Sequence, residues 1–98
     1  AVRSNLPILT IIVNNGVMAG YGNYMPDAVE KYQSSATGGD YTAMSQAMGA
    51  YAERIEKASD VRAALERGVA QTEAGNVAVL EFMTREEPVL AAASKWGM

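Results

Sequence analysis

Two asparagines and a glycine directly follow an apolar run, and these residues are well suited to hold a phosphate through a metal ion. The run, residues 6–13, reads LPILTIIV, and Asn14, Asn15 and Gly16 come next. An amide oxygen is a neutral, hard ligand for Mg²⁺ or Ca²⁺. A glycine lets the backbone turn tightly and approach a phosphate closely. The competing interpretation is a simple turn, because Asn and Gly are common loop residues after a strand.

The apolar run itself predicts a strand that is covered on both faces, since it hardly alternates with polar residues. In α/β proteins, ligands bind at the carboxyl ends of such strands, which is where the asparagines lie. We expect two more strands at 50–56 and 76–84, with helices at 41–48 and 60–73. This order predicts an α/β fold with a parallel sheet and flanking helices. Three strands make a small sheet, which indicates that further strands lie upstream.

Capping and periodicity set the expected details of the two helices. Asp40 is expected to cap the first helix, with Met44 and Met48 filling the core. Ser59 or Asp60 is expected to cap the second. The inward face of the second helix is expected to carry Val61, Leu65 and Val69. A short helix around Trp96 is expected near the end of the chain.

A long segment rich in Gly, Tyr and Ser, residues 17–39, follows the asparagines. Pro26 predicts a short helix inside it. Because its glycines restrain the backbone little, we expect the least ordered internal stretch of the cofactor-free chain here. Its tyrosines could line a substrate pocket or a lid, but we favour packing and partner contacts. The aromatic set is Tyr21, Tyr24, Tyr32 and Tyr41.

Composition excludes several classes of function. The 98 residues carry a net charge of −3, with eight basic and eleven acidic side chains, which argues against nucleic-acid binding. Histidine and cysteine are both absent, so disulfides, thiolate metal sites and a histidine base are excluded. No apolar run reaches the roughly 20 residues that span a bilayer. We therefore expect no membrane partner and a cytoplasmic location. We expect Asp27, Glu30 and Lys31 on a solvated helix face.

The asparagine pair also carries a family resemblance. Strand-Asn-Asn-Gly followed by VMAGYGNYMP resembles the second half of the thiamine-diphosphate motif, in which a Gly-Asp-Gly stands upstream and a divalent metal clamps the cofactor's diphosphate. The stretches GGDYTAMSQAMGAYAERIEKASDVRAALERGVAQ and NVAVLEFMTREEPVL are similar to the C-terminal end of acetolactate-synthase-like and oxalyl-CoA-decarboxylase-like enzymes. The resemblance spans nearly the whole chain. It implies chemistry on a 2-oxo acid or an acyl-CoA relative, with thiamine diphosphate and Mg²⁺ as cofactors.

The resemblance also implies a role for each residue that matches the motif. Asn15 would coordinate the metal through its side-chain oxygen, and Val17 would do so through its backbone carbonyl. Gly16 and the backbone near Met18 would approach the diphosphate. Asn14 would be structural and hydrogen-bond the turn.

The chain departs from the family pattern because it contains no Gly-Asp-Gly and opens at Ala1, a few residues before the first strand. The metal-binding Asp and the catalytic Glu of the family are therefore missing. We expect residues 1–98 to be the C-terminal portion of a thiamine-diphosphate-binding domain, inactive alone. Its partners would be the remainder of the parent chain and further subunits of a homo-oligomer, a dimer or tetramer. The alternatives are a small non-catalytic α/β interaction module and a free-standing phosphate-binding protein.

Overall fold

A three-stranded parallel sheet organises the part of the chain, residues 1–86, that the computed structural model describes. The strands are β1 (Leu9–Asn14), β2 (Tyr51–Ile55) and β3 (Ala78–Met83). Their order in the sheet is β1-β3-β2, and both pairs are parallel. The predicted α/β class and all three predicted strands are therefore confirmed, with bounds that differ by one to three residues.

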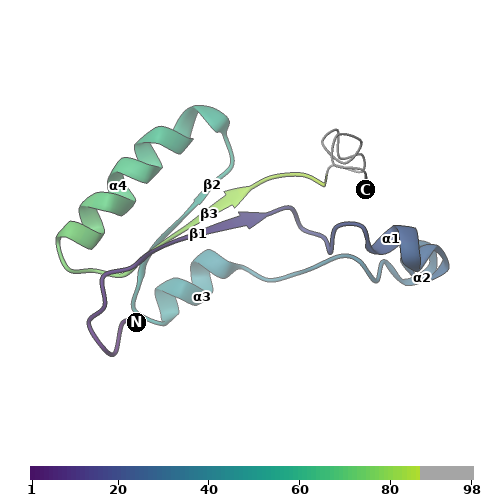
Figure 1. The fold of residues 1–98 in the computed structure, drawn as a ribbon, viewed down its shortest axis with the longest axis horizontal. Coiled ribbons are helices and arrows are strands. Elements are labelled where there is room, and N and C mark those ends of the chain that lie inside the picture. Colours follow the sequence, from purple (N-terminus) through teal and green to yellow (C-terminus); the bar gives the residue numbers. More distant parts are fainter. Residues whose placement is uncertain (87–98) are drawn as a thin grey trace, which may run out of the picture. The chain divides into compact units, whose positions relative to one another are not determined.

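Helices lie on both faces of this sheet (Figure 1). The connecting helices are α3 (Tyr41–Ala47), which leads into β2, and α4 (Val61–Glu73), which joins β2 to β3. Successive side chains of a strand point to opposite faces. Leu80 accordingly lies against α4, whereas Glu81, the next residue, hydrogen-bonds to α3.

The apolar core lies between the sheet and α4. Its buried members are Ile55, Ala64 and Leu80. The partly buried side chains around them are Leu9, Tyr51, Val61, Leu65 and Phe82. The buried positions of α4 are Ala64 and Gly68. The prediction that Val69 faces inward is wrong, since its side chain is 45% exposed. Small residues fill that side of the helix because they let it approach the sheet closely.

Helix α3 is capped as predicted, but the side that it buries differs from the predicted one. Asp40 Oδ1 accepts a hydrogen bond from the Ala43 N–H at 2.8 Å, which confirms the N-cap. The prediction that Met44 and Met48 fill the core is wrong, because they are 56% and 73% exposed. The buried residue of α3 is Ser45. A helix of seven residues is too short for periodicity to fix its inward face.

The start of α4 also departs from expectation. A 3₁₀ turn, η1 (Ala58–Asp60), leads into the helix, and the Asp60 side chain makes no capping hydrogen bond. Asp60 therefore occupies the N-cap position, as predicted, but it does not cap the helix through its side chain. The helix ends before Gly75, whose φ of +89° suits glycine. The helix expected around Trp96 lies outside the described residues.

Within residues 1–86, β1 is an edge strand of the sheet. It pairs with β3 alone, and its side chains Ile11 and Val13 are 46% and 69% exposed. The prediction of a strand covered on both faces is therefore wrong for these two residues. β1 therefore carries more apolar side chains than the rest of residues 1–86 covers.

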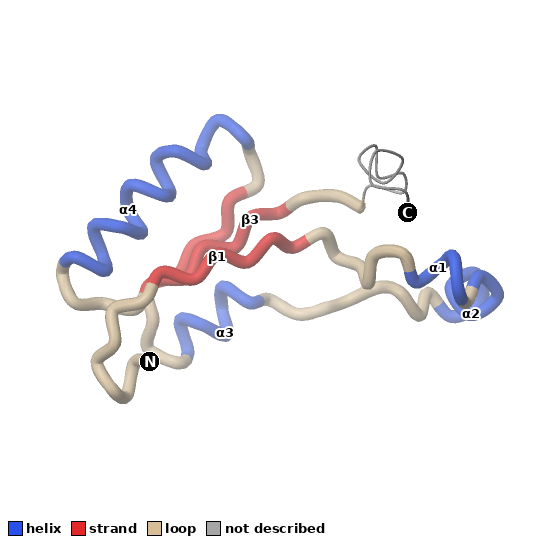
Figure 2. Tube along the Cα trace, in the orientation of Figure 1, coloured by secondary structure: helices blue, strands red, loops and turns tan. Residues whose placement is uncertain are grey.

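A second compact unit begins at Asn15 and takes in residues up to Gly38. It contains the short helices α1 (Tyr21–Tyr24) and α2 (Pro26–Tyr32). Val17 and Ala36 form an isolated antiparallel bridge between its two loop arms (Figure 2). The helix predicted from Pro26 is confirmed. That this stretch is the least ordered part of the cofactor-free chain stays a prediction.

Candidate functional site

A hydrogen bond to the side chain of Asn15 shapes the turn that follows β1. Asn15 Oδ1 accepts from the Val17 N–H at 3.1 Å, which is an Asx turn. Gly16 between them has a φ of +74°, in the left-handed region that favours glycine, and the space where a Cβ would stand is open. The sequence forms this turn because one residue supplies the acceptor and the next supplies the backbone conformation.

The antiparallel bridge determines which way the Val17 backbone points. Two hydrogen bonds flank it, from Met18 N–H to Ser35 O at 2.7 Å and from Thr37 N–H to Gly16 O at 2.9 Å. Val17 and Ala36 are therefore a non-hydrogen-bonded pair, in which each residue's own N–H and C=O point away from the partner arm. The Val17 N–H meets Asn15 Oδ1 on that outward side. The amide oxygen of Asn15 and the carbonyl of Val17 thus lie on one side of the backbone.

The donor set of this loop fits a hard divalent cation in part. An amide oxygen has two lone pairs, so Asn15 Oδ1 can accept from Val17 and still bind a metal. The two neutral oxygens of Asn15 and Val17 would fill two of the about six positions around Mg²⁺. A diphosphate could fill two more. Within residues 1–86, no three carboxylates gather at one place that could hold a metal. The loop can therefore supply the neutral oxygen ligands of a metal site, but it does not supply a carboxylate.

Asn14 is hydrogen-bonded to the sheet. Its Nδ2 donates to Glu81 Oε2 at 2.7 Å, and its backbone carbonyl accepts from the Thr84 N–H at 2.8 Å. Both bonds join the end of β1 to β3 or to the residue just beyond it. The predicted bonds of Asn14 were to the turn, whereas these two bonds tie it to β3 and to the residue beyond it. That Asn14 is not a metal ligand stays a prediction.

Glu81 is the residue that the sequence analysis missed. It is fully buried, and its Oε1 accepts from Thr42 N–H at 3.2 Å, Thr42 Oγ1 at 2.9 Å and Arg54 Nε at 3.2 Å. Burial raises the pKa of this carboxyl, but the hydrogen bonds from Asn14, Thr42 and Arg54 outweigh burial and hold the pKa below its ordinary value. The signal that could have revealed it is a single carboxylate within an apolar strand.

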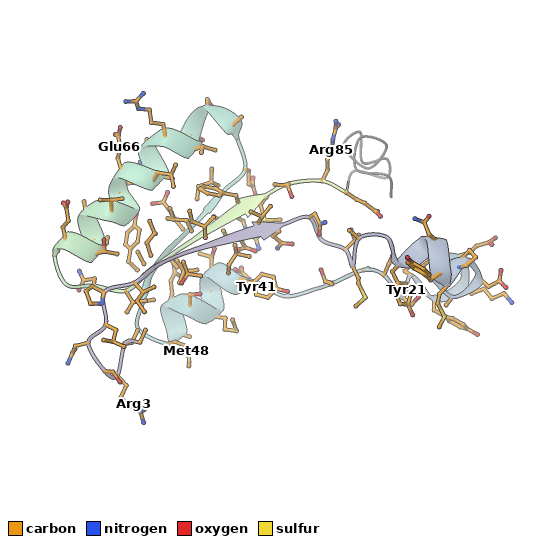
Figure 3. The ribbon with its side chains drawn as sticks, in the orientation of Figure 1. Arg3, Tyr21, Tyr41, Met48, Glu66 and Arg85 are labelled. Atoms are coloured by element: carbon orange, nitrogen blue, oxygen red, sulfur yellow. The ribbon has the colours of Figure 1, made fainter. Side chains whose placement is uncertain are left out.

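A second carboxylate cluster lies on the opposite face of the sheet. Glu53 accepts two hydrogen bonds from Arg67, at 2.6 and 2.9 Å, and one from the Tyr51 hydroxyl. The bonds from Arg67 hold the pKa of Glu53 below its usual value. This cluster joins β2 to α4. Farther out on α4, Glu66 pairs with Arg62 at 3.2 Å and points away from the sheet (Figure 3).

An apolar cavity lies by the amino ends of β2 and β3. It has a volume of about 480 Å³. Its lining consists of Ala1, Val2, Arg3, Met44, Ser45, Met48, Ala50, Val77 and Val79. The only charged side chain among these is Arg3. Because α/β proteins bind ligands at the carboxyl ends of their strands, we assign the candidate site to the loop after β1 and not to this cavity.

The side chains of α1 and α2 are largely exposed. Asp27, Glu30 and Lys31 are exposed, as predicted for a solvated helix face. Tyr24 and Tyr32 are 87% and 78% exposed. Of the helices within residues 1–86, none has the length and apolar character needed to cross a membrane.

Comparison with known proteins completes the assignment of the family. No curated protein matches the chain. The family model of the thiamine pyrophosphate enzyme C-terminal TPP binding domain matches residues 1–82, which include the Asn-Asn-Gly loop and Glu81. Thiamine pyrophosphate is the same compound as thiamine diphosphate. The predicted relation to a thiamine-diphosphate-binding domain is therefore confirmed, and the chain belongs to the family of thiamine pyrophosphate enzymes through their C-terminal TPP-binding domain.

Proposed function

We propose that this chain supplies the Asn-Asn-Gly half of a diphosphate and Mg²⁺ site in a thiamine-diphosphate-dependent enzyme that acts on 2-oxo acids, either acetolactate-synthase-like or a decarboxylase. The observation that carries the proposal is the placement of the Asn15 amide oxygen and the Val17 carbonyl on one side of the loop after β1. Membership of the family supports the cofactor. The sequence resemblance supports the substrate class.

In this proposal the chain's residues bind and orient the cofactor. Thiamine diphosphate, when bound, supplies the group that attacks a carbonyl and stores the resulting carbanion. Asn15 and Val17 give Mg²⁺ two neutral oxygens, and Gly16 lets the backbone near Met18 approach the diphosphate. A carboxylate that neutralises the metal comes from another part of the enzyme, because the loop offers none.

We also propose that the enzyme is at least a homodimer. The sequence resemblance implies an active site that is built between subunits. The exposure of Tyr24 and Tyr32 supports a partner contact, since tyrosine is enriched at protein interfaces. Sedimentation of the assembled enzyme should give a dimer or tetramer. A monomer that binds the cofactor fully would contradict the proposal.

Substitution of Asn15 tests the proposed metal site. The protein to use is the assembled enzyme, meaning this chain together with the polypeptide that supplies the carboxylate. Mg²⁺ is titrated calorimetrically in the presence of thiamine diphosphate. Asn15→Ala should weaken Mg²⁺ binding tenfold or more, on the scale of about 10- to 100-fold seen when metal-site partners are lost.

Asn15→Asp is the matched control, because it keeps an oxygen donor at the same position. It should retain more Mg²⁺ affinity than the alanine variant. An Asn15→Ala enzyme with unchanged affinity would overturn the assignment, and the Asn-Asn-Gly would then be only a turn of a non-catalytic module.

A further inference from the structure

The carboxylate of Glu81 stands where an apolar side chain would be expected. β3 reads AVLEFM, and Glu81 is its one charged residue, at the centre of the sheet with no exposed surface. A buried charge must be paired and hydrogen-bonded to be tolerated, and replacing a buried ion pair by apolar residues is often neutral or stabilising. Stability of the fold is therefore a weak reason for a glutamate at this position.

The two oxygens of this carboxylate have different partners. Three donors from α3 and β2 converge on Oε1, two from Thr42 and one from Arg54. Arg54 also lies 3.7 Å from Asp40, so the guanidinium is itself held. With Oε1 anchored, Oε2 is fixed in position and accepts from Asn14 Nδ2 at 2.7 Å, the shortest of the four bonds.

This contact acts on the residue that directly precedes the candidate metal ligand. The side chain of Asn14 is bound to Glu81, and its backbone carbonyl accepts from Thr84 N–H. A carboxylate only accepts hydrogen bonds, so it can bind the Asn14 amide in just one of its two orientations. Both the side chain and the peptide of Asn14 are thereby held at the start of the loop.

We propose that Glu81 is a positioning residue of the diphosphate and metal site. By holding the Asn14 amide, Glu81 fixes the peptide bond that leads into Asn15. The loop therefore loses less conformational freedom when the metal binds. The inference rests on the proposed function of Asn15. It adds a role for a buried carboxylate that touches neither metal nor cofactor.

A reversal of donor and acceptor tests this role. Glu81→Gln is nearly isosteric and can keep an oxygen toward Thr42 and Arg54, but its amide nitrogen then faces the Asn14 amide nitrogen. The Asn14 side chain can keep a bond to residue 81 only by turning its oxygen toward it, which gives up the single orientation that the carboxylate enforces. In the double variant Glu81→Gln with Asn14→Asp, the amide of residue 81 donates to a carboxylate at residue 14. The bond is restored with opposite polarity, and the net charge is unchanged.

Glu53→Gln is the matched control. It is the same substitution in the same sheet, and it removes the charge that binds Arg67, but Glu53 faces α4 and has no contact with Asn14 among its hydrogen bonds. It measures what the loss of a partly buried carboxylate does to the fold alone. Thermal midpoints of all the variants are recorded beside the binding data.

The measurement is the Kd of Mg²⁺ in the presence of thiamine diphosphate, taken by calorimetry on the assembled enzyme. Glu81→Gln should raise the Kd about tenfold. Glu53→Gln should leave it within about twofold, as expected for a site without shared partners. The double variant should bind Mg²⁺ clearly more tightly than Glu81→Gln and also more tightly than Asn14→Asp, which adds the same carboxylate without the restored bond. If Glu81→Gln does not fold, Asn14→Ala, which keeps the other three donors of the carboxylate, should give the same rise.

Two results would overturn the inference. One is a Glu81→Gln enzyme that binds Mg²⁺ as well as Glu53→Gln does. The other is a double variant that binds Mg²⁺ no more tightly than Glu81→Gln or no more tightly than Asn14→Asp, because only the restored bond, and not the added charge, would make it tighter than both. If Asn15→Ala weakens binding while Glu81→Gln does not, this inference alone fails. If Asn15→Ala has no effect, the proposed function fails and the inference fails with it.

Discussion

Leu80 of β3 lies against Gly68 of α4, where a Cβ on residue 68 would stand 3.0 Å from Leu80 Cδ1. The same Cβ would be 2.9 Å from Leu9 Cδ1 on β1. Both distances are shorter than ordinary van der Waals contact. The absence of a side chain at residue 68 therefore sets how closely the helix approaches the sheet.

Gly68→Ala should lower stability even though alanine is the better helix former. The gain in helix propensity is about 1 kcal/mol, whereas overpacking a core costs about 1–3 kcal/mol. We expect the thermal midpoint to fall by a few degrees. Ala63→Gly, at an exposed position of the same helix, measures the propensity term alone. A Gly68→Ala variant more stable than the parent would show that the leucines move aside freely.

The acid limb of the stability profile should depend on Glu81. The folded-state pKa of this carboxyl lies below its ordinary value, so its contribution is fully present above the unfolded pKa of about 4.3 and is lost as the pH falls through the folded pKa. The groups that face it are Asn14, Thr42 and Arg54, with Asp40 on the far side of the guanidinium. Thermal midpoints measured from neutral pH down to about pH 3 test this dependence.

The comparison in that experiment is with Glu81→Gln, which cannot ionise. The gap between the two midpoints should be constant near neutral pH and should shrink below about pH 4. Glu53 also has a lowered pKa, but it is common to both proteins and cancels in the difference. Two curves that stay parallel down to pH 3 would show that the Glu81 charge does not stabilise the fold.

Gly16→Ala should weaken cofactor binding through backbone strain. The φ of Gly16 is +74° and nothing would obstruct a Cβ there, so the cost is conformational, about 1–2 kcal/mol for an L-residue. We expect roughly a tenfold rise in the Kd of thiamine diphosphate with Mg²⁺ for the assembled enzyme. Gly38→Ala, in the same unit with open space and no positive φ, is the control and should bind normally.

Residues 1–98 alone should bind thiamine diphosphate feebly and show no catalytic activity. The proposed metal contacts are one amide oxygen and one carbonyl oxygen, both neutral, and Mg²⁺ dehydrates reluctantly without anionic ligands. Histidine is absent from the chain as a base. Isothermal titration of this polypeptide with thiamine diphosphate and Mg²⁺ is the direct measurement. Micromolar affinity would mean that other residues of the chain complete the site.

Features that arise from neighbouring residues could be predicted from the sequence. The Asp40 side chain caps α3 by accepting a hydrogen bond from the N–H of Ala43, three residues farther along the chain. The end of α4 follows from the positive φ that Gly75 can adopt. The parallel sheet could be predicted from the alternation of strands and helices, because each of these elements shows as a local pattern of apolar residues. The Asn-Asn-Gly loop could be located because it adjoins such a run.

Features that depend on residues far apart in the chain could not be predicted. Glu81 lies 67 positions from Asn14 and 39 from Thr42, and no spacing in the sequence indicates that the three would meet. The inward side of α4 follows from the fit of Gly68 against Leu80, and periodicity had favoured Val69 instead. The exposure of Met44 and Met48 likewise depends on how α3 packs on the sheet. Seven residues are too few for the sequence pattern to predict that packing.

The last strand of the sheet in the sequence is the central one in space. β1 and β2 each pair with β3 and are not paired with each other. Among the strands within residues 1–86, β1 and β2 therefore find their partner only once residues 78–83 have been synthesised. Every pairing in the sheet spans many residues, and such topologies fold slowly because loop closure precedes any gain from contact. Truncation before Ala78 would thus remove both strand pairings found within residues 1–86, together with the carboxylate that holds Asn14.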